Sequence, residues 1–316
     1  MPLTMPLTVP LIAHRLPNNP ICDIRQQHHL GGNINGPSLI AAPAWLPKRH
    51  GRYYLYFAHH HGDHIRLATA DDLSGPWHIH SQGVLSLPQT PLPLQKPDVA
   101  EPQWAVARGV SGLYPHIASP DVHIDHEQHQ IRMYFHGLDH DGVQRSLSAY
   151  SYDGVDWTID TRRINQTYLR VFTYQDITYA LALGGQFMRQ TDDGDFLLGG
   201  WAFPSGHRHA AVLLRGDQLH VIWTRIGDAP EKLLYSCIDL TRPWLDWTAE
   251  STCALLEPEQ EWEGTDCPIT ASDIGIAKPR ERALRDPCIF DSGTDVYVIY
   301  ACAGESALGI AKLSGL

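Results

Sequence analysis

A hairpin-like unit that recurs along the chain constrains the fold more than any other feature of the sequence. Its clearest copy is SPDVHIDHEQHQIRMYFH, from Ser119 to His136, in which two alternating apolar–polar runs flank a polar turn at Asp125–Gln130. Alternation with a period of two is typical of half-buried β-strands, so this copy predicts a β-hairpin. Units of the same kind begin near residues 36, 120, 169, 209 and 286.

Most units continue into a third short apolar run and end on a large aromatic residue. The aromatic end-markers are Trp77, Trp157, Phe196 and Trp247. A small antiparallel meander has two apolar faces that it cannot bury alone, so such repeats stack radially, and five of them close a propeller. A β-sandwich is the main alternative, but its strands show no unit period of this kind. The sequence therefore predicts an all-β fold, a five-bladed β-propeller.

The whole chain, residues 1–316, is accounted for by one such domain with two long insertions. The insertions are residues 81–115, which are rich in proline and contain Trp104, and residues 255–283. Their composition is that of ordered loops, and loops this long inside a compact domain are usually functional, so we expect both to wall a pocket. Residues 1–33 are irregular and are candidates to supply a closing strand to the last blade.

Composition narrows the class of partner. The formal charge of -11, from 35 acidic and 24 basic residues, argues against nucleic acid and against an anionic membrane surface as partners. It suits a neutral or cationic small ligand such as a sugar.

The apolar N-terminal stretch has no basic region and no small-residue cleavage site, and no apolar run approaches the roughly 20 residues of a membrane span. The six cysteines form no CxxC pair. We expect a cytoplasmic protein with reduced thiols.

Strand direction selects the candidate site residues. In an up-down-up meander, the start of the first strand and the second turn lie at the same end of the blade. One face of the propeller therefore gathers the unit starts and the second turns. The polar residues predicted on that face include Asn35, His59, His60, His61, Asp63, Asp121, His136, Arg170, Arg208, His209, Glu231, Arg285, Asp286 and Glu305.

Several of these motifs resemble those of five-bladed glycoside hydrolases. They are NGPSLI in the first unit, ASPDV in the second, RDPCIF in the fifth and the run GRYYLYFAHHHGDHIRLATADDLSGPW. The resemblance is to the family 43 arabinanases, arabinofuranosidases and xylosidases, and the RDP is similar to that of the invertase and levansucrase group. It implies that an Asp before Pro in the first blade is a general base, that a second Asp tunes pKa values, and that a Glu is the general acid; the Asp of RDP would stabilise the transition state.

The first blade departs from this pattern, because it offers Asn35-Gly36-Pro37 where the family has Asp-Pro. An amide cannot take a proton from water at neutral pH. Either the base has moved, or the chemistry differs, or there is none.

Glycoside hydrolysis needs a protonated carboxylic acid and an ionised carboxylate. Asp121 and Asp286, at strand starts, match the family motifs best and are predicted as the first two catalytic carboxylates. For the general acid we rank Glu231 first, with Glu263 and Glu305 next, and nearby tryptophans would raise the pKa of such an acid by desolvation. The alternative for each Asp is a turn residue that bonds backbone amides.

The remaining candidates would bind substrate. Arg170, Arg208 and Arg285 open the last three units, and their convergence would suit an anionic sugar such as a uronic acid, unless Arg285 only pairs with an internal acid. At most two of the three consecutive histidines at 59–61 can converge, which favours substrate hydroxyl binding or simple exposure to solvent over a metal site. Trp104 and Trp262 are candidates for stacking on a sugar ring. No cofactor and no metal ligand set is predicted, although the axial channel leaves room for a structural cation.

Two classes of function follow. The first is a glycosidase, most simply exo-acting on a short oligosaccharide. The second is a non-hydrolytic propeller, such as a sugar-binding protein, a lyase or a cyclase acting on a small metabolite, which the departure at Asn35 favours. The feature that discriminates between them is a water-activating carboxylate that replaces the missing one.

Overall fold

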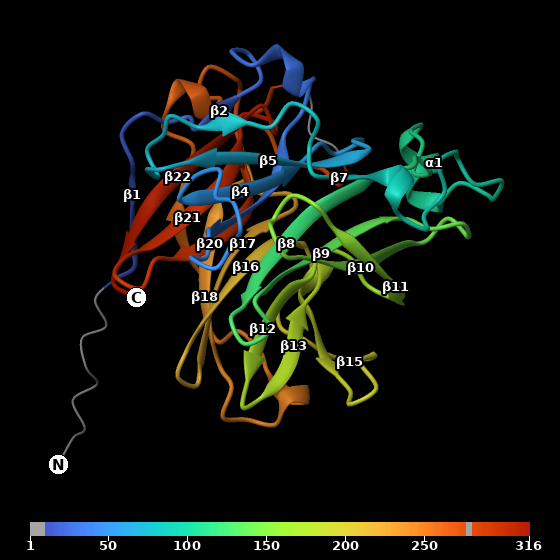
Figure 1. Ribbon diagram of the computed structural model, residues 1–316. Helices are drawn as coiled ribbons and strands as arrows, with labels where there is room; N and C mark the ends of the chain where they lie inside the picture. Colours follow the sequence, from blue (N-terminus) through green and yellow to red (C-terminus); the bar gives the residue numbers. More distant parts are fainter. Residues whose placement is uncertain (1–9, 276–279) are drawn as a thin grey trace.

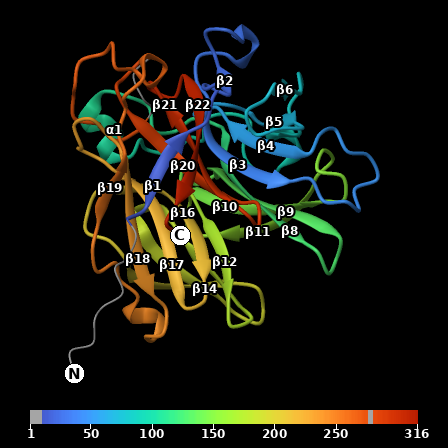
Figure 2. The same ribbon diagram turned by 90° about the vertical axis from the view of Figure 1, so that its left-hand side faces the viewer.

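The computed structural model describes residues 10–275 and 280–316 and contains five antiparallel sheets that radiate from a common centre (Figures 1 and 2). The prediction of a five-bladed β-propeller is confirmed. From the axis outward, the first blade consists of β3 (Asn35–Ala41), β4 (Tyr53–Ala58), β5 (His64–Ala70) and β6 (His78–Ile79). The second consists of β8 (Ile117–Asp125), β9 (Gln130–Leu138), β10 (Gln144–Ser151) and β11 (Thr158–Ile164). The third consists of β12 (Arg170–Tyr174), β13 (Ile177–Leu181), β14 (Gln186–Gln190) and β15 (Phe196–Trp201). The fourth blade consists of β16 (His207–Arg215), β17 (Gln218–Arg225), β18 (Leu233–Asp239) and β19 (Cys253–Leu256). The fifth consists of β20 (Leu284–Asp291), β21 (Val296–Cys302) and β22 (Ala307–Ser314), and β1 (Ile12–Arg15) is its outermost strand.

The ring is closed by the N-terminal part of the chain, which pairs with the C-terminal strand. Strand β1 lies antiparallel to β22, and the short β2 (Cys22–Asp23) pairs with the other end of the same strand (Figure 1). A closing strand from residues 1–33 was one of the expectations from the sequence, and β1 and β2 supply it. Residues 1–9, which form part of the apolar N-terminal stretch, lie outside the described residues.

The core lies between the blades, because each meander buries both faces against its neighbours. Tyr56 packs edge-on against Trp157, with ring centroids 5.8 Å apart, and joins the first two blades. Trp247 packs against Phe187 and Tyr179 of the third blade. The tryptophan end-markers seen in the sequence therefore fill the spaces between sheets.

Each of four inner strands carries a break in its pairing near its start. Register shifts fall between Asn35 and Ser38, between Ala118 and Asp121, between His207 and Ala210, and between Arg285 and Cys288. Inside three of these breaks the residue before a proline has a left-handed backbone: Gly36 (φ 56°), Ser119 (φ 52°) and Asp286 (φ 47°). A β-bulge of this kind re-aims the side chain at the strand start, here at the end of the axial channel. We call this end of the channel the mouth.

The residues that follow the breaks tie successive blades together. The Val122 amide donates to Ser38 Oγ (2.9 Å), the Val171 amide donates to Asp121 Oδ2 (2.8 Å), and the Leu39 amide donates to Cys288 Sγ (3.4 Å). Arg170 Nε donates to the Ala210 carbonyl (2.7 Å). Side chains at equivalent depths thus hold neighbouring inner strands side by side.

The two predicted insertions lie between sheets and meet each other. The first contains β7 (Leu85–Ser86), the 3₁₀ turn η2 (Leu87–Gln89) and one short helix, α1 (Gln103–Arg108), where only loop was expected. The second contains η5 (Glu261–Glu263), and its residues 276–279 lie outside the described residues. Arg108 pairs with Asp273 (3.3 Å) and joins the two insertions.

The other 3₁₀ turns are η1 (His28–Leu30), η3 (Leu183–Gly185) and η4 (Trp244–Asp246). Among the described residues, no helix has the length and apolarity needed to cross a membrane.

Candidate active site at the mouth of the propeller

Asp286 is the carboxylate that the bulge of the fifth blade presents at the mouth. Its Oδ1 lies 2.6 Å from Nδ1 of His209, which comes from the start of the fourth blade. Its Oδ2 is buried and has no hydrogen-bond partner among the described residues. A buried carboxylate with one oxygen held and the other unpaired is an arrangement typical of functional sites, because structural carboxylates normally satisfy both oxygens.

Two further buried carboxylates lie beside Asp286, and both have guanidinium partners. Glu231 is fully buried between Arg208 Nε (2.9 Å) and Arg285 Nε (2.8 Å). Glu305 accepts hydrogen bonds from Asn33 Nδ2 (2.6 Å) and Asn35 Nδ2 (3.2 Å) and pairs with Arg285 Nη1 at 3.3 Å. Burial acts to raise the pKa of Glu305, but the hydrogen bond and charge of His60, together with Arg285 and Asn33, lower it far below the usual range.

Aromatic and imidazole rings form a continuous arc around the mouth. The successive centroid distances are 6.3 Å from His60 to Tyr114, 4.7 Å from Tyr114 to His116, 5.5 Å from His116 to His136, 4.3 Å from His136 to Tyr168, and 4.7 Å from Tyr168 to His209. We call these six rings the aromatic arc. Its two ends are the two imidazoles that contact carboxylates, since His60 Nδ1 lies 3.5 Å from Glu305 and His209 contacts Asp286.

The inner histidines of the arc are held neutral by their surroundings. Burial and the Tyr114 carbonyl act in opposite directions on His116, and burial prevails, lowering its pKa to about 4. Burial lowers the pKa of His136 well below its ordinary value, and the charges of His116, His60 and His209 add to the effect. Burial raises the pKa of Tyr114 to about 12, with a contribution from Glu305. These rings are therefore uncharged surfaces near neutral pH.

The register breaks correct the interpretation of the first blade. Gly36, Ser119 and Asp286 occupy equivalent positions, each before a proline and each with positive φ. The residue that stands where the resemblance to family 43 implies an Asp before Pro is therefore Gly36 and not Asn35. Asn35 pairs with Ala58 in the ladder and donates to Glu305. Of the three equivalent positions, one carries a carboxylate.

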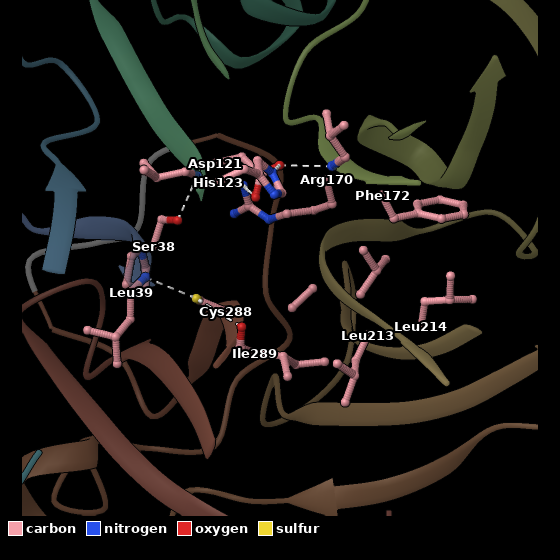
Figure 3. A pocket seen from close by; sticks show the side chains of 15 residues that line it. Ser38, Leu39, Asp121, His123, Arg170, Phe172, Leu213, Leu214, Cys288 and Ile289 are labelled. Atoms are coloured by element: carbon pink, nitrogen blue, oxygen red, sulfur yellow. Dashed lines mark hydrogen bonds and ion pairs between the residues drawn. The ribbon is translucent and has the colours of Figure 1, made fainter. Parts of the chain in front are cut away.

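The same comparison places Asp121 away from the mouth. Asp121 follows its proline, whereas Asp286 precedes its own, so Asp121 corresponds to Ser38 and Cys288 and lies deeper along the axis. Its Oδ2 lies 2.7 Å from His123 Nε2 and accepts the Val171 amide. Figure 3 shows Asp121 beside His123 and Arg170 in the wall of an axial cavity. The predicted pairing of Asp121 with Asp286 at one mouth is not found.

The three arginines do not present free guanidinium groups at the mouth. Arg170 donates to the carbonyls of Ala210 and Pro120. Arg208 pairs with Glu231 and donates to the Asp273 carbonyl of the second insertion. Arg285 pairs with Glu231, Glu281 and Glu305. Arg285 therefore pairs with internal acids, which was the alternative to binding substrate. The three arginines do not form a binding site for the carboxylate of an anionic sugar.

Four other predicted residues lie elsewhere or have other contacts. Glu263 is buried at the closure of the fifth blade, where its Oε1 lies 2.8 Å from both Arg15 Nε and the Tyr300 hydroxyl. Asp63 is largely exposed and pairs with His64. Trp104 lies on α1 and packs near Gly112 of the same insertion. His59 lies behind His60, near Gly31 and Gly62, and burial lowers its pKa to about 4.

Several mouth residues were missed in the sequence analysis. Tyr114 ends the first insertion, His116 and Tyr168 precede inner strands, and Asn33 precedes the first one. Alignment of the units on Pro37, Pro120 and Pro287 would have placed Gly36, Ser119 and Asp286 in one column. No comparable signal marks Tyr114 or Asn33, since loop and interblade contacts bring them to the mouth.

The sequence predicts no metal ligand set, and it leaves room for a structural cation in the axial channel. In the described ranges, no group of three or more His, Cys, Asp or Glu side chains is arranged to hold a metal ion. The donor sets at the mouth are a carboxylate–imidazole pair and carboxylates that contact arginine.

Solved structures with the same fold include family-43 glycoside hydrolases. The chain is similar to a β-xylosidase/α-arabinofuranosidase from a compost microbial metagenome, with 12% identity over 96% of each chain and a TM-score of 0.58. It is also similar to an α-L-arabinanase of Cellvibrio cellulosa, with 12% identity over 89% of this chain and 92% of that chain and a TM-score of 0.54. At this level of identity the likeness shows the five-bladed fold.

Sequence comparison gives a closer relative. The chain matches no protein-family model. It is 33% identical over 334 residues to the uncharacterized protein R118 of Acanthamoeba polyphaga mimivirus, covering 96% of this chain and 90% of that protein. The chain therefore belongs to the same protein family as R118, and its fold is the five-bladed propeller of the family-43 glycoside hydrolases.

Proposed function

We propose that the protein is a glycosidase that acts on a short oligosaccharide at the mouth, with Asp286 as its catalytic carboxylate. The observation that carries this proposal is the buried, unpaired Oδ2 of Asp286 beside a carboxylate oxygen held by His209. Such a carboxylate is suited to activate water or to attack an anomeric carbon. The solved family-43 enzymes of the same fold include complexes with xylotriose and with arabinohexaose, which supports an oligosaccharide as substrate.

The lining of the mouth suits a hydroxyl-rich ligand. Asn35 Oδ1, Ser119 Oγ and His136 Nδ1 are buried polar atoms without partners among the described residues. Buried polar atoms normally have hydrogen-bond partners, and sugar hydroxyls both donate and accept. The neutral inner rings of the aromatic arc, Tyr114, His116 and His136, supply apolar faces against which the C–H face of a sugar can pack.

The proton for the leaving oxygen is assigned to His60. Glu231 and Glu305 both contact guanidinium groups, which are the partners of a carboxylate and not of a carboxylic acid. His60 and His209 are the two ends of the aromatic arc that contact carboxylates, and His209 is engaged with Asp286 itself. His60, which contacts Glu305, would transfer a proton to the glycosidic oxygen while Asp286 acts at the anomeric carbon or on water.

The test uses aryl glycosides that differ in their leaving groups. Asp286→Asn should lower turnover about a hundredfold or more on every substrate that the wild type hydrolyses. His60→Gln should lower turnover of nitrophenyl glycosides but spare that of dinitrophenyl glycosides, because a good leaving group departs without a proton. His59→Gln is the matched control and should keep both activities. Absence of turnover by the wild type on a panel of pyranosides and furanosides, and on xylotriose and arabinohexaose, would contradict the proposal.

A second candidate is a carbohydrate-binding propeller without hydrolysis. Gly36, Ser119 and Asp286 occupy equivalent positions in three blades, and only Asp286 is a carboxylate. This favours a binding protein, because the resemblance to family 43 implies more than one catalytic carboxylate at the starts of the blades. Calorimetric binding of xylotriose or arabinohexaose without release of shorter sugars would identify this function.

A further inference from the structure

A hollow in the surface lies where the third and fourth blades meet, on the face opposite the mouth. Its volume is about 420 Å³, and it is lined by the first hairpin turns of the two blades, at Gln175 and Asp217, and by residues 240–247, which follow β18. The first hairpin turn and the strand start lie at opposite ends of a blade. The interblade hollow, as we call it, is therefore separate from the mouth and shares no lining residue with it.

Trp244 of η4 presents its indole ring to the interblade hollow. The ring is half-buried and lies on β15, where a Cβ added to Gly199 would overlap it. Tyr179 lies 6.3 Å from Trp244 and 4.8 Å from Trp247, measured between ring centroids, and Tyr179 and Trp247 belong to the core between the blades. The strand and the core rings thus hold Trp244 in place, and the part of its ring that they leave uncovered is a surface for stacking.

Polar groups of two kinds surround this ring. Asp217 Oδ1 accepts a hydrogen bond from the Tyr174 hydroxyl (2.8 Å), and Gln175 Nε2 donates to the same hydroxyl (3.0 Å). Asp217 Oδ2 and Gln175 Oε1 have no recorded hydrogen bond in the described part of the chain. Arg242 Nη2 donates to Glu250 (2.7 Å), while its Nε and Nη1 have no recorded partner there. The hollow therefore offers acceptors from the hairpin turns and donors from the segment after β18.

The charges of the hollow select against an anionic ligand. Arg242 is already paired with Glu250, whereas Asp217 has no salt-bridge partner within the ranges that the structure describes. A phosphate or carboxylate ligand would be repelled by this uncompensated negative charge. A quaternary ammonium ligand needs a cage of several aromatic faces, and in this hollow the rings of Tyr179 and Trp247 are buried in the core.

A sugar fits this lining, because its ring has a C–H face that stacks on an aromatic surface and its hydroxyl groups both donate and accept hydrogen bonds. We propose that the interblade hollow is a second saccharide site, which holds a neutral oligosaccharide or polysaccharide chain by stacking on Trp244.

Native gel electrophoresis with a soluble polysaccharide in the gel tests the proposal, since a protein that binds the polysaccharide migrates more slowly. The probes are arabinoxylan, linear arabinan, mixed-linkage β-glucan and galactomannan. At least one of them should retard the wild type, and Trp244→Ala should weaken that binding about tenfold or more. Trp244→Phe keeps a ring and should recover part of the binding. Trp201→Ala is the matched control, because Trp201 is 56% exposed on β15 outside the hollow, and it should migrate as the wild type does.

Arg242→Ala gives a second, independent test at an exposed side chain. It removes the open donors without changing the core and should weaken binding about threefold or more. Thermal unfolding of each variant separates a loss of binding from a loss of fold. The proposal is overturned if no probe retards the wild type, if Trp244→Ala or Arg242→Ala is retarded as strongly as the wild type, or if calorimetry shows binding of tetramethylammonium and of none of the polysaccharides.

These results are independent of the chemistry at the mouth. Trp244 lies outside the mouth, so Trp244→Ala should keep the wild-type turnover of any aryl glycoside that the protein hydrolyses. Retardation of a wild type that hydrolyses no glycoside would contradict the glycosidase proposal and leave the second saccharide site standing. Glycoside turnover without retardation would have the opposite meaning.

Discussion

Gly36 of the first blade packs directly against Ser119 of the second. A Cβ added to Gly36 would lie 2.9 Å from the Ser119 Cα and 3.3 Å from its Oγ. The two blades are therefore in close contact at the position where the resemblance to family 43 implies a first-blade Asp. There is no space at this point for a carboxylate side chain, so Asp286 is the carboxylate that the three equivalent bulges supply to the mouth.

Gly36→Asp is expected to destabilise the fold rather than to restore a general base. The added side chain meets the Ser119 backbone, and steric overpacking of this kind costs about 1–3 kcal/mol. Gly216→Asp is the matched control, because Gly216 has the same φ of 56° with no heavy atom within 4 Å of an added Cβ. Urea unfolding should show a larger loss for Gly36→Asp than for Gly216→Asp. Equal losses, with new glycoside turnover in Gly36→Asp, would show that the two blades separate easily.

Glu231→Gln is expected to be strongly destabilising. Glu231 is fully buried and neutralises two guanidinium groups, and removal of one partner from such a network costs about 3–5 kcal/mol. Glu257→Gln, which removes a solvent-exposed partner of Lys232, should cost less than about 1 kcal/mol. Chemical denaturation measures both. A Glu231→Gln protein with wild-type stability and no turnover would instead identify Glu231 as the general acid ranked first from the sequence.

Asp121 is expected to behave as a link between blades. Asp121→Ala removes the acceptor of the Val171 amide and should cost about 1–3 kcal/mol of unfolding free energy. Asp121→Asn keeps an acceptor oxygen for the Val171 amide but removes the charge beside the buried Arg170, so it should recover part of that loss and not all of it. Glycoside turnover per folded molecule should stay within a fewfold of wild type in both variants. A loss comparable to that of Asp286→Asn would return Asp121 to the catalytic assignment.

Stability should fall as the pH drops below about 6.5, the pKa of an unperturbed histidine. Burial lowers the pKa of His116 to about 4, and burial with the charge of His209 lowers that of His207 to about 3. Above pH 6.5 neither histidine is protonated in either state. Below it, the unfolded chain binds protons that the folded chain excludes, so each group lowers the unfolding free energy by up to about 1.4 kcal/mol per pH unit until its folded pKa is reached.

His207→Phe tests this pH dependence. The ring of His207 stacks between Phe203 and Trp223, with centroids at 4.7 Å and 5.2 Å, and a phenyl ring keeps that stacking without a titrating group. Its stability relative to wild type should therefore improve between pH 6.5 and pH 4 in urea unfolding measured at several pH values. The exposed His126 is the control, and His126→Asn should follow the wild-type pH profile. A parallel profile for His207→Phe would exclude His207 as a source of the acid sensitivity.

The sequence by itself determined the fold, because the signal for each blade is local and is repeated. Period-two alternation in units such as Ser119–His136 specifies a hairpin, and the unit recurs often enough to require radial stacking. The sequence also determined that Asp286, His209 and Glu305 open on one face, since strand direction alone fixes the end of the blade on which a unit start lies.

Only the tertiary structure decided the role that each of these groups can have. The position of Asp121 depends on a two-residue offset across a bulge, which moved it from the mouth into the axial cavity beside Arg170. The arginine partners of Glu231 come from the start of its own blade and from the fifth blade, and that of Glu263 comes from the N-terminal closing strand. Nothing near either residue in the chain therefore foretells that it is neutralised by arginine. The contact that excludes a carboxylate at Gly36 is likewise made by a neighbouring blade, because interblade distances arise from the packing of the whole ring.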